Sequence, residues 1–337
     1  MGTKLACAYF AQVLSRDGPL GTIDCVLRVL FDLGYSLLSI RCRAAICDSL
    51  LYSGHDDGFR GISWDICSRD SPLKFSIVTI SFNQARFLEQ AICSVIEQDY
   101  PDIEYIIVDP GSTDGSRRII EKYADKLNNI IFEKDEGPAD GLNKGFARAT
   151  GDVYGHLNAD DVLLPGTIKK AANFFKFNKI IDIVSGHCYV IDERGVILHK
   201  IFSHKFDLRR YYAGSCILVQ QSTFFRSNIF NKTEGFNVQN KVSWDGELAV
   251  DFALQGARFA VVHDYWSCFR VYSQSISGSS EYMKCLKKEH IRIKGKISFD
   301  NISNLKKKYL WFTGWLLQPK TLTLRIIDGL INKKRLL

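Results

Sequence analysis

Two acidic segments of the sequence each follow a predicted β-strand directly. The first, Val108–Ser116, has the sequence VDPGSTDGS and comes after the apolar run Tyr105–Ile107. The second, Leu157–Asp161, has the sequence LNADD and comes after Asp152–His156. Open α/β sheets bind ligands beyond the carboxyl ends of their strands, so both segments belong to the binding edge of such a sheet. Two acidic sites there favour a nucleotide held with a divalent metal, and therefore an enzyme.

The elements around these segments alternate between strand and helix. The nearly continuous β-rich run 75–82 predicts a parallel strand covered on both faces. It is followed by residues 86–98, whose apolar side chains share one helical face. Alternation of this kind predicts βαβ units and a mostly parallel sheet. The further predicted strands are 104–109, 130–133 and 153–157, and the further predicted helices are 116–124, 139–149 and 165–177.

The pattern changes after Ile181. Two β-rich runs, 183–191 and 196–202, are separated by Asp-Glu-Arg-Gly and predict a β-hairpin. A helix over 247–254 and a strand over 258–262 follow. We expect this half of the chain to form the second side of a cleft whose first side binds the nucleotide.

Composition places the chain among ordinary globular proteins. Its 337 residues are 46% apolar and 24% charged. The ten cysteines are scattered and form no Cys-x-x-Cys pair, which favours buried free thiols in a reducing compartment over zinc or redox chemistry. We expect neither a signal peptide nor a membrane-spanning helix, because charged residues interrupt even the longest apolar stretch, Cys25–Ile40.

Positive charge is concentrated near the C-terminus. The net charge is +7, and the segment 284–337 alone carries 14 basic and three acidic residues. Lys306–Lys308 stand beside the aromatic and aliphatic run 309–317, a combination that suits an anionic membrane surface. A charged helix that packs back on the domain is the alternative. No nucleic-acid-binding motif is present, so nucleic acid is not expected as a partner.

Five segments, in this order, resemble the family 2 glycosyltransferases of the GT-A fold. The resemblance covers about residues 75–275. It implies a Rossmann-like GT-A domain over 73–275, preceded by a helical extension of unknown role (1–72) and followed by a basic helical tail (276–337). The five segments are 76–84 (SIVTISFNQ), 108–115 (VDPGSTDG), 140–145 (DGLNKG), 151–161 (GDVYGHLNADD) and 244–248 (WDGEL).

The resemblance also implies roles for single residues. Asp160 and Asp161 correspond to the acidic signature that holds Mg²⁺ or Mn²⁺, and Asn158 stands where the family usually has aspartate. Donor contacts are implied by the strand-end segments and by the 140–145 helix. The donor residues so implied are Thr79, Ser81, Asn83, Asp109, Asp140, Asn143, Lys144, Asn158 and Asp160.

Asp245 corresponds to the catalytic base of the family. An inverting transfer needs a carboxylate that takes the proton of the acceptor hydroxyl. The companion acid usual in the family is replaced by Trp244. On the acceptor side the resemblance suggests Gln220, Gln221 and Glu247, with Gln220 in the place of a common histidine.

Structural explanations remain open for several of these residues. Asp109 could cap a turn, Asp245 could cap a helix, and the Asp160–Asp161 pair could complement a helix N-terminus. Lys144 could belong to a solvated polar face, and residues 220–226 could form an ordinary edge strand.

The expected protein is a cytoplasmic, inverting, metal-dependent glycosyltransferase, peripheral on the inner face of the membrane. It would move one sugar from a nucleotide-sugar, UDP-linked for preference, to a glycan or lipid-linked acceptor of surface polysaccharide synthesis. Two alternatives are a non-catalytic GT-A module and another nucleotide-sugar enzyme such as a nucleotidyltransferase. The sugar, the acceptor, the linkage and the oligomeric state are not determined by the sequence.

Overall fold

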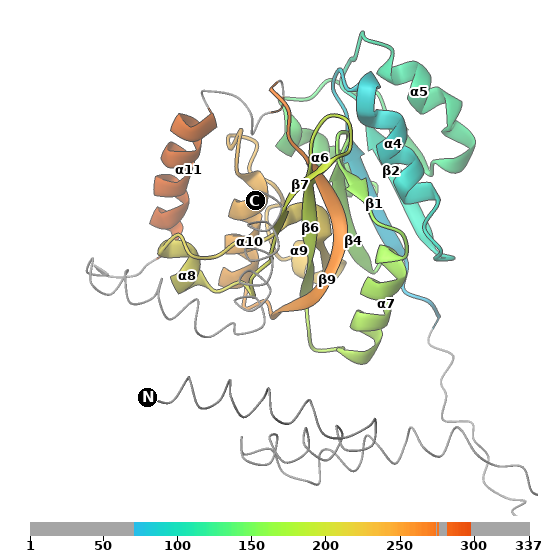
Figure 1. The fold of residues 1–337 in the computed structure, drawn as a ribbon. Helices are drawn as coiled ribbons and strands as arrows, with labels where there is room; N and C mark the ends of the chain where they lie inside the picture. Colours follow the sequence, from blue (N-terminus) through green and yellow to red (C-terminus); the bar gives the residue numbers. More distant parts are fainter. Residues whose placement is uncertain (1–70, 274, 276–281, 298–337) are drawn as a thin grey trace, which may run out of the picture. The chain divides into compact units, whose positions relative to one another are not determined.

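The structure is a computed structural model that describes residues 71–273, 275 and 282–297. The described residues all belong to one compact unit. Within the described residues, nine strands form one mixed sheet in the order β3-β2-β1-β4-β8-β6-β9-β5, with β7 paired to β6 (Figure 1).

The first half of the sheet is parallel. β1 pairs in register with β2 and with β4, and β2 pairs with β3. Their carboxyl ends therefore meet at one edge, as the sequence predicts. In chain order these elements are β1 (Phe75–Ile80), α4 (Ala85–Ile96), β2 (Ile103–Val108), α5 (Ser116–Lys122), β3 (Asn129–Ile131), α6 (Pro138–Phe146), β4 (Val153–Asn158), β5 (Val162–Leu163) and α7 (Thr167–Phe177).

The second half is mostly antiparallel. β8 runs antiparallel to both β4 and β6, and only the long β6–β9 pair is parallel. Gly155 of β4 makes the junction possible, because a Cβ there would lie 2.7 Å from a ring carbon of Phe224 in β8. The elements are β6 (Ile183–Ile191), β7 (Ile197–Ile201), α8 (Leu208–Tyr212), β8 (Thr223–Arg226), α9 (Ser227–Phe230), α10 (Trp244–Leu254), β9 (Phe259–Arg270) and α11 (Tyr282–Lys296).

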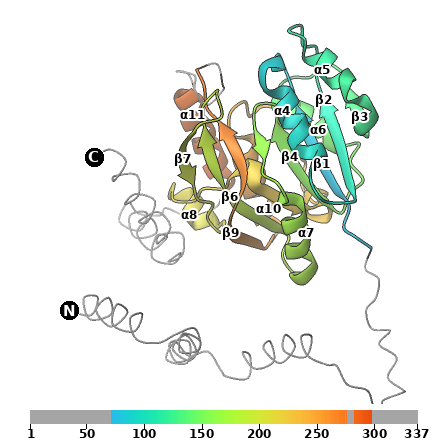
Figure 2. The same cartoon turned by 45° about the vertical axis from the view of Figure 1, so that its right-hand side comes forward.

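Helices cover both faces of the sheet (Figure 2). Side chains that alternate along β1 enter two separate cores: Ile77 packs with α4, α5 and α7, and Val78 packs with α6, α10 and α11. Burial on both faces explains why β1 and β2 are almost uniformly apolar.

The sequence predicted the observed α/β architecture, with most element ends displaced by only a few residues. Strand β5 and the short helices α8 and α9 were not predicted, and β9 extends eight residues beyond the predicted end at Val262. Strand β8 lies in the segment 220–226 for which an edge strand was the alternative, and helix α11 lies in the region predicted as a basic helical tail. Residues 1–70 of the predicted extension and 298–337 of the predicted tail lie outside the described residues. In the part of the chain that is described, no helix is long and apolar enough to cross a bilayer.

Candidate active site

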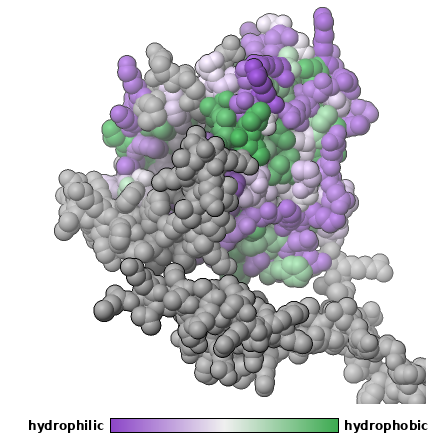
Figure 3. Space-filling model, in the orientation of Figure 1, coloured by the Kyte–Doolittle hydropathy of each residue, from purple (hydrophilic) through white to green (hydrophobic). Residues whose placement is uncertain are grey.

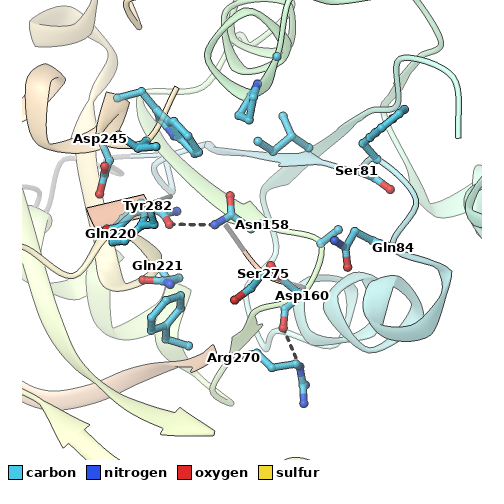
Figure 4. A pocket seen from close by; sticks show the side chains of 18 of the residues that line it. Ser81, Gln84, Asn158, Asp160, Gln220, Gln221, Asp245, Arg270, Ser275 and Tyr282 are labelled. Atoms are coloured by element: carbon cyan, nitrogen blue, oxygen red, sulfur yellow. Dashed lines mark hydrogen bonds between the residues drawn. The ribbon is translucent and has the colours of Figure 1, made fainter. Parts of the chain in front are cut away.

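A cavity of about 840 Å³ opens at the carboxyl ends of β1, β2 and β4. Ser81 follows β1, Pro110 follows β2, and Asn158 is the last residue of β4; all three line the cavity. The opposite wall comes from the second half of the sheet and from α10 and α11. In the view of Figure 4, Asn158 lies between Asp245 on one side and Asp160 on the other.

Asp160 presents its carboxylate to this cavity from the turn between β4 and β5. The Tyr272 hydroxyl lies 3.1 Å from Asp160 Oδ2 and donates to it. Below it, the buried Arg270 guanidinium donates to the Asp160 carbonyl oxygen at 2.9 Å and fixes the turn. Burial raises the pKa of the Asp160 carboxyl above its usual value.

Asp161 has a different environment. Its side chain is fully buried and does not line the cavity. Oδ1 accepts from the Arg270 main-chain N–H at 3.0 Å, while Oδ2 accepts from Gln221 at 3.0 Å and from Asn158 at 3.2 Å. Burial, followed by the neighbouring Asp160 charge, raises its pKa well above the usual range. The geometry therefore makes Asp161 a support for the turn rather than a first ligand.

Asp160 and Asn158 are the candidate oxygen donors for a divalent cation at this edge of the sheet. Asn158 Oδ1 is buried and has no hydrogen-bond partner among the described residues, and Ser81 Oγ shares this property. Mg²⁺ and Mn²⁺ need only one or two protein oxygens when substrate phosphates and water complete the shell. Asp160 and Asn158 fit such a cation. A preformed cluster of three or more acidic, histidine or cysteine side chains is not found in the described ranges.

Asp245 lies in the first turn of α10 on the other side of the cavity. It is half-buried beside Trp244, and Tyr282 of α11 lines the cavity next to it. Burial raises the pKa of the Asp245 carboxyl, a shift that suits a group that must accept a proton near neutral pH.

The sequence model of the family described as glycosyl transferase family 2 matches residues 76–277, more than half of the chain. The chain belongs to this family. The match ends at residue 277, before α11 begins at Tyr282.

Curated relatives agree with this assignment. An uncharacterized glycosyltransferase of Nostoc is 38% identical over 131 residues, which are 36% of this chain and 40% of that protein. An uncharacterized glycosyltransferase of Methanocaldococcus jannaschii is 26% identical over 230 residues, 66% of this chain and 77% of that protein. The Nostoc match thus spans less than half of that relative's length.

Solved structures show the same fold. Staphylococcus aureus TarS in complex with UDP-GlcNAc superposes with a TM-score of 0.55 at 21% identity, over 71% of this chain and 70% of that one. The mannosyltransferase PcManGT of Pyrobaculum calidifontis, in complex with GDP-Man and Mn²⁺, gives 0.53 at 20% identity, over 75% and 73%. The GT-A architecture expected for this glycosyltransferase is thus confirmed.

The predicted nucleotide residues of the glycosyltransferase divide into lining and supporting residues. Ser81 lines the cavity. The Asn83 side chain accepts from the Thr113 N–H at 2.9 Å, and Asp109 accepts from the Ser112 N–H at 2.8 Å. Both therefore shape the loop beyond β2 and do not line the cavity. Thr79 is on the other face of β1, where its hydroxyl pairs with Tyr105 at 3.0 Å, and it does not line the cavity.

The predicted α6 residues also lie outside the cavity lining. Asp140 and Lys144 pair with each other at 3.0 Å on the helix surface. Asn143 bonds both main-chain groups of Phe236 at 2.8 Å and joins α6 to the loop before α10. The cavity is lined instead by Lys134 and Asp135, from the loop preceding α6, where no sequence motif marks them.

The predicted acceptor residues also divide into some that line the cavity and one that does not. Gln220 and Gln221 line the cavity, and Gln220 donates to the His156 carbonyl oxygen at 2.9 Å. Glu247 does not line it: its fully buried carboxylate is held by Arg292 and Lys296 of α11. We therefore do not retain Glu247 as an acceptor residue.

Proposed function

We propose that the protein transfers a single sugar from a nucleotide-sugar, a UDP-sugar for preference, to a hydroxyl of a glycan or lipid-linked acceptor. The observation that carries this proposal is the placement of Asp160 and Asp245 on opposite sides of one cavity. Two carboxylates so placed can serve the leaving diphosphate and the attacking hydroxyl separately.

In the proposed reaction the acceptor oxygen attacks the anomeric carbon as the bond from that carbon to the phosphate oxygen breaks. Asp245 takes the hydroxyl proton, and the nucleoside diphosphate leaves with the bonding electrons. Because attack and departure occur on opposite faces of the anomeric carbon, the configuration is inverted. Asp160 and Asn158 would hold a divalent cation, which supplies positive charge beside the diphosphate when bound.

The two walls of the cavity support a division of labour. Polar groups such as Ser81 and Asn158 line the strand ends on the donor side. Apolar and aromatic side chains, among them Leu218, Trp244 and Tyr282, surround Asp245. Aromatic side chains stack well on the apolar faces of sugar rings, and aliphatic ones suit a lipid-linked acceptor. A role in surface polysaccharide synthesis at the inner face of the membrane accords with such an acceptor.

The test is donor-dependent release of nucleoside diphosphate, measured across a panel of nucleotide-sugars with and without Mn²⁺. We expect release with one donor class, stimulated by metal, and its loss in Asp160→Asn. Asp264→Asn is the matched control, because Asp264 does not line the cavity and contacts Lys170 at 2.7 Å and the Tyr265 N–H at 2.8 Å. Release of pyrophosphate from a nucleoside triphosphate would identify a nucleotidyltransferase. Binding of a nucleotide-sugar without its turnover, whichever acceptor is added, would identify a non-catalytic module.

A further inference from the structure

The imidazole ring of His156, in β4, is buried without a polar partner. The residue is 7% exposed, and neither Nδ1 nor Nε2 forms a hydrogen bond with any described residue. Apolar side chains on the surface, such as those over β7 in Figure 3, are ordinary on a folded protein. A buried polar side chain without a partner is rare, and it requires an explanation such as a bound water or a role in catalysis.

The His156 side chain points toward α10. Tyr154, two residues earlier in β4, packs in the core that includes Leu248 and Phe252 of α10. Side chains two residues apart on a strand share a face, so His156 points the same way as Tyr154. Its ring meets the ring of Phe236, in the loop before α10, edge-on at a centroid distance of 5.4 Å. The ring thus lies on the side of the sheet whose covering helix bears Asp245.

A small cavity lies between His156 and Asp245. Its volume is about 20 Å³, and both residues line it. Its other lining residues are apolar except for Gln220 and Thr223. A cavity of this size has room for one water molecule, and a buried water needs two to four polar partners, which these residues supply. Asp245 and Gln220 also line the large cavity, so the small cavity lies directly behind the Asp245 carboxylate.

The Asp245 carboxylate has no cation near it in the described part of the chain. Burial raises its pKa, and only main-chain N–H groups of its own turn oppose this effect. The titratable side chains that face Asp245 from other elements are Tyr211 of α8 and Tyr282 of α11. Burial raises the pKa of both phenols, so both stay neutral. A neutral N–H donor behind the carboxylate would therefore stabilise its charge where no cation does.

We propose that one water molecule in the small cavity links the His156 ring to the Asp245 carboxylate. An imidazole ring carries an N–H in either tautomer, and this N–H donates to the water oxygen. The water donates in turn to Asp245, which stabilises the charge of the carboxylate and fixes its orientation toward the large cavity. His156 is thus a positioning residue for Asp245. The role of Asp245 as the base rests on the proposed function, whereas the link itself does not.

Titration of Asp245 tests the link without donor or acceptor. The full chain is labelled with carbon-13 at the aspartate carboxyl groups, and the Asp245 signal is identified by its loss in Asp245→Asn. We expect His156→Phe, which keeps a ring against Phe236 and removes both nitrogens, to raise the pKa of Asp245 by about one unit. His156→Asn and His156→Gln place an amide N–H near the positions of Nδ1 and Nε2, and at least one of them should restore the pKa of the unmodified protein.

A second histidine provides the matched control. His290 of α11 packs edge-on against Tyr211 at a centroid distance of 6.0 Å and lines neither cavity, so His290→Phe should leave the Asp245 titration unchanged. His156→Leu, which also lacks an N–H, replaces His156→Phe if the latter does not fold. An Asp245 pKa that is the same in the folded variant and in the unmodified protein would overturn the proposal. An equal rise of this pKa in His290→Phe would overturn it too.

Turnover separates this proposal from the proposed function. In His156→Phe the acid limb of turnover against pH should move upward by about one unit, while the KM of the donor stays unchanged. If the unmodified protein turns over no nucleotide-sugar, the proposed function fails, and the titration still decides whether His156 is linked to Asp245. A rise in the Asp245 pKa with an unmoved acid limb would establish the link and show that Asp245 is not the base.

Discussion

Replacing Glu247 by glutamine tests whether this buried carboxylate is structural. Its oxygens accept from Asn240 at 2.8 Å and from Arg292 Nη1 at 2.8 Å, and Lys296 Nζ lies 2.6 Å away. Arg292 and Lys296 belong to α11, so this cluster fastens α11 to α10. Glutamine keeps the size of the side chain and removes the charge that both cations share.

The magnitude follows from the pKa of Glu247. The Arg292 and Lys296 hydrogen bonds outweigh the opposing effect of burial and lower this pKa from 4.5 to about 2. A shift of this size corresponds to about 3 kcal/mol. Since Arg292 and Lys296 are 38% and 34% exposed, solvent screening reduces the expected loss in unfolding free energy to about 1–2 kcal/mol.

The sign of the pH dependence is fixed by the same shift. A carboxylate whose pKa is lowered by folding stabilises the protein fully above its unfolded pKa, and this contribution disappears as pH falls from 4.5 toward 2. The difference in unfolding free energy between the unmodified protein and Glu247→Gln should therefore be largest near neutral pH and should vanish in acid.

Urea unfolding at several pH values measures this difference. Glu193→Gln is the matched control, because Glu193 forms a surface ion pair with Arg86 and should cost at most about 0.5 kcal/mol. The reasoning is refuted if Glu247→Gln is as stable as the control at neutral pH. A folded Glu247→Gln protein that has lost a hundredfold or more in turnover would return Glu247 to the catalytic candidates.

Three further predictions concern the cavity and the sheet. Asp245→Asn should keep its donor affinity, and its turnover should fall by a factor of about 10²–10⁴. In the unmodified protein, turnover should fall on acidification at a pH above 3.8, the usual pKa of aspartate, because burial raises the pKa of Asp245. Asp160→Ala should abolish the Mn²⁺-dependent part of UDP binding in calorimetry, and an unchanged metal dependence would exclude Asp160 as a ligand. Gly155→Ala should cost about 1–3 kcal/mol in thermal unfolding, because its methyl group would overlap Phe224.

The architecture could be predicted from the sequence because the hydrophobic patterns of strands and of helices are both clear in the first half of the chain. A helical tail was predicted for the region of α11, but its packing on α10 was not, because ion pairs such as Lys296 with Asp251, at 3.0 Å, give no signal in the hydrophobic periodicity. The two residues of β5 are too few to give any periodic signal.

The site residues were predicted as segments, and the structure resolves which members of each segment line the cavity. Asp160 and Asp161 are adjacent and chemically identical. Arg270 and Gln221, which are distant in sequence, donate hydrogen bonds to the Asp161 carboxylate, whereas Asp160 lines the cavity. Local sequence cannot contain this information. The position of Thr79 could have been predicted from the sequence. Successive side chains of β1 point to opposite faces, and Ile80 lines the cavity, so Thr79 points to the other face.

The boundary between the parallel and antiparallel halves of the sheet has a consequence for recombination. The strand ends that line the donor side all come from residues before α7, whereas the wall around Asp245 comes from residues after β6 begins at Ile183. A crossover in the loop 178–182 would therefore exchange one wall as a block and leave the other intact. Such chimeras must retain Gly155 opposite Phe224, because β4 would come from one parental sequence and β8, which pairs with it there, from the other. Substrate range in this lineage could then change one wall at a time, by exchange of half-genes rather than by accumulated point substitutions.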